Sequence, residues 1–196
     1  MKISTLLLRE PFKKIFEKTM HSFLKDSTKT SYNIKWTNKT YFNNIKSTDQ
    51  KWYCNPLINS LFVKGVNPNV FNSINGEYSY NTLRPLRSLF QRIYLILSQS
   101  KLTSIFMSKY VVNFSPQIEG ANNKLIIGGN NKIRIIDIYN KEVYVLLKDG
   151  FNIKYLEREI YVRKVFPFLP ITKINFIGNN SLWYSEEYIS GVSPNR

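Results

Sequence analysis

Apolar and polar residues change their spacing along this chain, and the changes predict where helices give way to strands. In residues 11–25, apolar residues recur every three or four positions and lysines fill the other face. Pro11 suits the first turn of this helix. Residues 84–110 have the same helical spacing, with a break expected near 98–100. The pattern therefore predicts one helix near the amino terminus and one or two helices before residue 110.

The rest of the first part of the chain has no such spacing. Residues 26–82 are rich in Asn, Ser, Thr, Tyr and Lys, with Asn-Pro and glycine breaks, which predicts loops and short elements. Within them, residues 33–42 alternate as a strand would. Residues 111–123 contain a proline, a glycine and asparagines, which is typical of a linker. We place a domain boundary there, which gives domains of residues 1–120 and 121–196.

After that boundary the spacing becomes that of a β structure. Alternating or short apolar segments separated by turn residues predict five strands, at residues 123–129, 131–139, 142–148, 171–178 and 181–190. A helix is expected at about 153–165, because two prolines follow it. The expected fold class is α+β. A basic, mainly helical region of residues 1–120 precedes an antiparallel five-stranded sheet with one helix.

Composition narrows the classes of protein that the chain can belong to. A hydrophobic content of 43% argues against general disorder. A single cysteine and a single histidine exclude an internal disulfide framework and an ordinary Cys/His zinc cluster. We expect a buried thiol at Cys54, packing roles for the tryptophans and tyrosines, and no role for His21.

Charge points to an anionic partner for the first domain. The net charge is +15, of which residues 1–120 carry +11 and residues 121–196 carry +4. A nucleic acid or an anionic membrane surface would complement this excess of positive charge. The amino-terminal apolar run is three leucines, too short for the core of a signal peptide. We expect a cytoplasmic protein, with peripheral membrane attachment through its basic amphipathic helices as the alternative.

Candidate chemistry lies in the second domain. A glycine turn, residues 128–131 (Gly128, Gly129, Asn130 and Asn131), precedes Lys148 by two predicted strands, and Glu159 follows on the predicted helix. Glycines let backbone amides approach phosphates, a lysine binds the α- and β-phosphates, and a helical glutamate holds that lysine by an ion pair. These three parts, in this order, are typical of the first lobe of a kinase.

The segments IIGGNNKIRIID, IYNKEVYVLLK and LEREI resemble the opening of the aminoglycoside/choline kinase-like phosphotransferases. LWYSEEYISG resembles the hinge strand of that family. The resemblance covers about 70 of the 196 residues. It implies a nucleotide-binding lobe for ATP, with Gly128, Gly129, Asn130, Asn131, Lys148 and Glu159 near the phosphates, and backbone groups near Glu187, Tyr188 and Ile189 at the adenine.

The family's catalytic loop and metal-binding aspartate are missing from the sequence, since no His-Gly-Asp motif follows the hinge-like segment. The resemblance therefore implies neither a catalytic residue nor a metal ligand here. We expect the lobe to be inactive alone, as part of a truncated or split enzyme. The expected partner is a second catalytic lobe or another copy of the chain.

Simpler interpretations of the same residues remain open. The Gly-Gly-Asn-Asn segment also fits a plain hairpin turn, because these residues tolerate positive φ. Lys148 fits a lysine that protects a sheet edge from aggregation. Glu159 stands four residues before Arg163, which predicts a local ion pair on the helix. A basic nucleic-acid-binding protein without catalysis is the alternative function.

Overall fold

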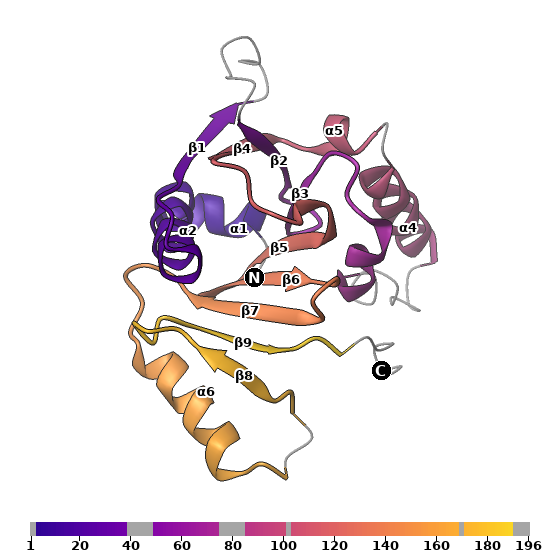
Figure 1. The fold of residues 1–196 in the computed structure, drawn as a ribbon. Helices are drawn as coiled ribbons and strands as arrows, with labels where there is room; N and C mark the ends of the chain where they lie inside the picture. Colours follow the sequence, from indigo (N-terminus) through magenta and orange to yellow (C-terminus); the bar gives the residue numbers. More distant parts are fainter. Residues whose placement is uncertain (1–2, 39–48, 75–84, 101–102, 169–170, 190–196) are drawn as a thin grey trace.

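One nine-stranded antiparallel sheet forms the centre of the protein (Figure 1). The computed structural model describes residues 3–38, 49–74, 85–100, 103–168 and 171–189. The strand order across the sheet is β1-β4-β2-β3-β5-β6-β7-β9-β8. The strands are β1 (Asn33–Asn38), β2 (Gln50–Asn55), β3 (Ser60–Val63), β4 (Tyr110–Ser115), β5 (Lys124–Gly128), β6 (Lys132–Asp137), β7 (Glu142–Leu147), β8 (Ile174–Ile177) and β9 (Trp183–Glu187).

Helices pack on both faces of this sheet. They are α1 (Ile3–Arg9), α2 (Phe12–Thr28), α4 (Pro85–Gln99), α5 (Ser104–Met107) and α6 (Lys154–Val165), with short 3-10 turns at Pro68–Phe71 and Ala121–Asn123. Figure 1 shows α2 beside the sheet and α6 next to β8 and β9. In the described part of the chain, no helix combines the length and apolarity needed to cross a membrane.

Helix α2 confirms the helix expected at residues 11–25. Its apolar stripe is buried against the sheet, and Phe16 and Phe23 contact the rings of Trp36 and Trp183 at centroid distances of 5.3 and 5.1 Å. The helix ends at Thr28 and is capped by Lys29, whose left-handed backbone (φ 60°) directs its N–H to the Lys25 carbonyl. The long apolar stripe therefore fixes α2 across strands at both ends of the sheet.

Residues 1–120 depart from expectation in two respects. The region contributes four strands, β1 to β4, to the sheet in addition to its helices, and residues 111–115 of the expected linker belong to strand β4. Strands β2, β3 and β4 lie inside the sheet, and β3 is buried along its whole length. Strands covered on both faces lose the alternation that predicts a strand, so the sequence pattern missed them. The strand expected at residues 33–42 is confirmed for residues 33–38, which form β1, and its remaining residues lie outside the described part of the chain. The helices α4 and α5 are confirmed.

The second part of the chain forms the expected elements. Among its described residues are the five strands β5 to β9 and one α-helix, α6. They do not make a separate five-stranded sheet, because β3 pairs with β5 through Ser60↔Ile127 and Leu61↔Ile126. The sheet thus continues across the boundary placed at residue 120, and the division into two domains stays a prediction. The confirmed class is α+β with a larger sheet than expected.

Candidate functional site

The glycine turn connects β5 to β6, as expected. Gly128 pairs with Ile133 across the hairpin, and neither glycine has a positive φ. Glycine is required at both positions because other atoms lie where a Cβ would be. A Cβ on Gly129 would lie 2.7 Å from the Lys132 carbonyl oxygen, and one on Gly128 would lie 2.6 Å from the Ile3 side chain. The turn is therefore tight because the backbone folds back on itself, and because α1 packs against it.

Lys148 lies directly beneath this turn. It follows the last residue of β7, and its N–H donates to the Asn131 carbonyl at 3.0 Å. Its ammonium donates to the Asn130 carbonyl at 2.7 Å. The rings of Phe12 and Phe151 lie 5.5 and 4.9 Å from the same ammonium. The structure thus brings together two of the parts that the sequence predicted, the glycine turn and the lysine.

The partner of Lys148 comes from the other end of the chain. Glu10, in the short connection between α1 and α2, forms an ion pair with the Lys148 ammonium. The lysine side chain is 0% exposed and the Glu10 side chain 19%. The interpretation of Lys148 as an edge lysine is therefore wrong, since it follows an interior strand and α2 covers it. Sequence reasoning missed Glu10, which carries no motif and is separated from Lys148 by 138 residues.

Glu159 does not reach Lys148, because the two residues lie on opposite faces of the sheet. Lys132 pairs with Leu147 across β6 and β7, so these two side chains share one face and Lys148 projects from the other. Glu159, on α6, forms an ion pair with Lys132. It also accepts a bond from Arg163 at 3.3 Å, which confirms the local helix pair. The predicted Lys148–Glu159 pair is therefore absent from this structure.

The electrostatics of Glu159 follow from these two cations. Burial of the carboxyl raises its pKa, but the hydrogen bond and charge of Lys132, with the charge of Arg163, outweigh that effect. The pKa of Glu159 therefore lies below its ordinary value of 4.5. The carboxylate stays ionised near neutral pH and fixes α6 to the sheet.

The hinge-like residues lie at the far end of β7 from Lys148. Glu187 pairs with Glu142, the first residue of β7, whereas Lys148 follows the last residue of that strand. At about 3.3 Å per residue the separation is roughly 20 Å. The N–H of Tyr188 donates to the Lys141 carbonyl at 2.8 Å, so this group is already satisfied. Ile189 has an exposed side chain. The predicted adenine contacts are therefore separate from the lysine and the glycine turn.

Helix α2 is tied to the second part of the chain at its middle as well. The N–H of Asp149, next to Lys148, donates to the Thr19 hydroxyl at 2.9 Å. The Asp149 carboxylate lies 3.3 Å from the Lys18 ammonium. Together with Glu10, these contacts hold the amino-terminal half of α2 over the end of β7. The lysine site is thus closed by residues from both domains proposed from the sequence.

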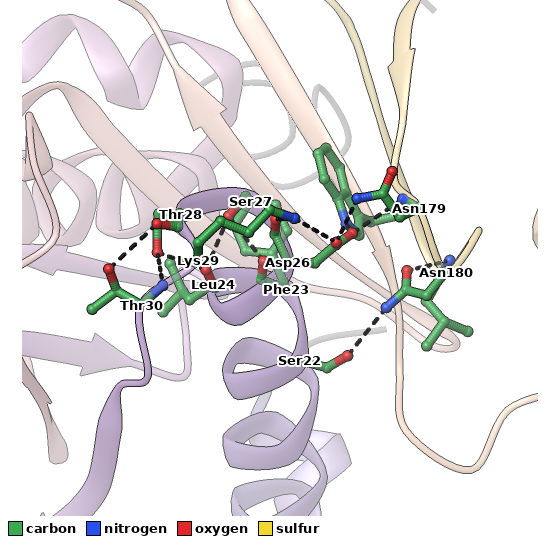
Figure 2. A network of polar contacts seen from close by, with 12 residues as sticks. Ser22, Phe23, Leu24, Asp26, Ser27, Thr28, Lys29, Thr30, Asn179 and Asn180 are labelled. Carbon is green, nitrogen blue, oxygen red and sulfur yellow. Dashed lines mark hydrogen bonds and ion pairs between the residues drawn. The ribbon is translucent and has the colours of Figure 1, made fainter.

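The carboxyl end of α2 is bound to the turn between β8 and β9 (Figure 2). Asp26 accepts bonds from the Asn179 N–H at 3.2 Å, the Asn179 amide at 3.1 Å and the Trp183 indole at 2.8 Å. The indole bond, followed by the bonds from Asn179 and Lys29, lowers the pKa of Asp26 below its ordinary value despite partial desolvation. The confirmed hairpin turn at residues 179–180 therefore serves as an anchor for the amino-terminal helix.

The cysteine, the tryptophans and the histidine noted in the sequence make packing or backbone contacts. Cys54 is fully buried, and burial raises the pKa of its thiol, which confirms the packing role expected for it. Trp52 and Trp183 are buried in the core. The Nδ1 of His21 lies 2.9 Å from the Tyr32 carbonyl oxygen. Among the residues that the structure describes, no group of His, Cys, Asp or Glu side chains has the arrangement of a metal site.

The chain has no match in three comparisons: none among models of protein families, none among curated proteins and none among solved structures.

Proposed function

We propose that residues 121–196 form the nucleotide-binding lobe of a kinase-like phosphotransferase, inactive without a catalytic lobe. The phosphates of ATP would bind at Lys148 and the turn of residues 128–131. The observation that carries this proposal is the buried ammonium beneath a glycine turn, held by a single carboxylate. We leave the adenine contacts expected near Glu187, Tyr188 and Ile189 out of this site, because they lie roughly 20 Å from Lys148 at the other end of β7.

Glu10 would be the internal competitor of the nucleotide. Its carboxylate occupies the side of the lysine where an anionic oxygen would bind, and both groups are largely shielded from water. A phosphate carries the same type of ligand atom with more charge, so it would replace the carboxylate at the ammonium. Binding then requires the connection between α1 and α2 to move. We leave Glu159 out of this site because it is paired with Lys132 on the opposite face.

Calorimetric titration with ATP tests the proposal. The wild-type protein should bind ATP weakly, and the Glu10→Gln variant should bind it more tightly, because the competing charge is gone. Lys148→Ala should abolish binding. Adenosine should bind no better to Glu10→Gln than to the wild type, because it has no phosphate to occupy the lysine.

Lys132→Ala is the matched control, since it removes the same charge from the other face of the sheet. A net charge of +15 attracts any polyanion, and this control separates such attraction from a defined site. Circular dichroism would establish that each variant is folded. The proposal is wrong if Lys148→Ala, in folded form, binds ATP as the wild type does.

A second candidate function, attachment to an anionic membrane, is favoured by the orientation of α4. The inward side of this helix carries the buried Leu95 and two polar residues: the Tyr94 hydroxyl donates to the Asn55 side chain at 3.1 Å, and Asn55 donates to Ser98 at 3.1 Å. Its apolar stripe is exposed, with Phe90 and Ile96 at 69% and 67%. The rest of the stripe is Leu89, Ile93 and Leu97. An apolar stripe on a protein of net charge +15 suits an anionic bilayer surface.

The two amphipathic helices differ in this respect. The stripe of α2 is buried, so the notion that both helices serve as membrane anchors is not supported for α2. Co-sedimentation with phosphatidylserine vesicles tests α4. Phe90→Ser should reduce pelleting, whereas Phe168→Ser, which changes an equally exposed phenylalanine elsewhere (77%), should not. Equal pelleting of both variants would rule out α4 as the anchor. Nucleic-acid binding stays a prediction from charge.

A further inference from the structure

A cavity of about 460 Å³ opens beside the carboxyl end of α2, separate from Lys148. Its floor is Trp52, Ile126, Ile135 and Tyr144, on strands β2, β5, β6 and β7. Ile126 is paired with Ile135, which is paired with Tyr144, so these side chains share one face of the sheet. The volume lies within the range of about 300–1,000 Å³ that is typical of small-molecule sites.

The wall of the cavity is apolar, with Phe23 and Leu24 from α2 facing the aromatic floor. Phe23 lies 5.5 Å from Tyr144, ring centroid to ring centroid. Mixed aromatic and aliphatic lining is what a flat ring or a branched chain contacts best. The lining therefore selects a ligand whose surface is mostly apolar.

On the side of α2, the polar rim of the cavity presents hydrogen-bond acceptors. The hydroxyls of Ser27 and Thr28 donate to the carbonyls of Phe23 and Leu24, at 2.8 and 2.7 Å, and the Thr30 hydroxyl donates to the Thr28 carbonyl at 3.3 Å (Figure 2). Because each hydroxyl proton is used in this way, these oxygens offer lone pairs to a ligand.

The charged groups at the cavity narrow the ligand class further. Lys124 forms an ion pair with Asp137, whose carboxylate is fully buried, so its charge is already balanced. Glu119 lines the same cavity and disfavours a bound anion. The protein's net charge of +15 disfavours a cation. A neutral ligand with hydroxyl donors fits both conditions.

We propose that this cavity binds a small, neutral, largely apolar molecule that carries one or two hydroxyl groups. The apolar part lies on the floor formed by Trp52, Ile126, Ile135 and Tyr144, and a hydroxyl donates to the rim. The site does not depend on nucleotide binding, since Lys148 lies at the opposite end of α2.

The probe for this proposal is 2-naphthol, followed by ligand-observed NMR and by the change in tryptophan fluorescence. We expect saturable binding to the wild-type protein. Ile135→Phe places a larger side chain in the cavity and should weaken binding at least tenfold, and Ile126→Phe tests the same floor if the first variant does not fold. Phe90→Ser is the control for binding to the exposed stripe of α4 and should leave the affinity unchanged.

A second comparison tests the ligand class. 2-Naphthalenesulfonate has the same ring and an anionic group, and it should bind at least tenfold more weakly than 2-naphthol. Equal or tighter binding of the sulfonate would overturn the assignment of a neutral ligand. Absence of saturable 2-naphthol binding, or unchanged binding in a folded floor variant, would overturn the site itself.

Discussion

The ion pair between Glu10 and Lys148 should respond very differently to the loss of each partner. The Lys148 side chain is 0% exposed, whereas 19% of the Glu10 side chain is exposed. Glu10→Gln leaves a fully buried ammonium whose remaining partners are the Asn130 carbonyl and two aromatic rings. Lys148→Met leaves a carboxylate that reaches water. The variant that keeps the buried charge should therefore be the less stable one.

The expected losses of unfolding free energy follow from this difference in exposure. Removing one partner of a buried pair costs about 3–5 kcal/mol when the other charge is left without compensation. We expect about 3 kcal/mol for Glu10→Gln, because the carbonyl and the rings retain part of the stabilisation. Lys148→Met should cost about 1–2 kcal/mol, the lower part of the range of about 1–3 kcal/mol for a polar group that loses its partner, because the carboxylate is partly hydrated. The double variant should be more stable than the sum of the two losses implies, by about 2 kcal/mol.

Urea unfolding followed by far-UV circular dichroism measures all four proteins. A loss of 3 kcal/mol corresponds to a decrease in melting temperature of roughly 6–12 °C for a chain of this size. The same measurements on Lys18→Met, which removes an exposed lysine of α2, provide the control, with a loss within about 0.5 kcal/mol. Additive losses in the double variant, or a larger loss for Lys148→Met than for Glu10→Gln, would refute the reasoning.

Three further outcomes are expected. Gly129→Ala should destabilise the protein by about 1–3 kcal/mol, because the new Cβ meets the Lys132 carbonyl, whereas Gly128→Ala meets the side chains of Ile3 and Asn59 rather than backbone and should cost less in the same urea titration. The pKa of Glu159 is lowered in the folded state, so its contribution is present above about pH 4.5 and is lost as the pH falls through the folded value. Glu159→Gln should therefore flatten the acid side of a plot of unfolding free energy against pH, and an unchanged slope would contradict the assignment. Asp26→Ala should cost about 1 kcal/mol and should speed amide hydrogen exchange in the turn between β8 and β9, with unchanged exchange there arguing against the anchor.

Local signals were sufficient where an element repeats its apolar residues with its own period or has turn residues at its ends. The helices α2 and α4 were predicted from their spacing, α6 from the prolines that follow it, and the strands β5 to β9 from short or alternating apolar segments between turns. Spacing failed for β2, β3 and β4. Consecutive residues of these strands are buried, which removes the polar half of the pattern, and the short apolar segments then resemble loops.

The candidate site was likewise predictable from the sequence only in part. The order of glycine turn, strand and lysine predicted that Lys148 would lie near residues 128–131, because a hairpin returns the chain to its starting point. Its distance from Glu159 could not be predicted. A shift of one residue along a strand moves a side chain to the opposite face, and the register Lys132↔Leu147 puts Lys148 on the face of α2.

The sequence by itself thus determined the helices α2, α4 and α6 and the strands β1 and β5 to β9, and it gave the candidate residues for binding a phosphate. Only the tertiary structure decided which carboxylate neutralises the buried lysine and which segment covers it. Glu10 has no local signal, and its role exists because α2 lies across β7 and brings residues 138 positions apart into contact. Ion pairs between distant residues depend on the packing of whole elements, whereas periodicity depends only on the residues within one element.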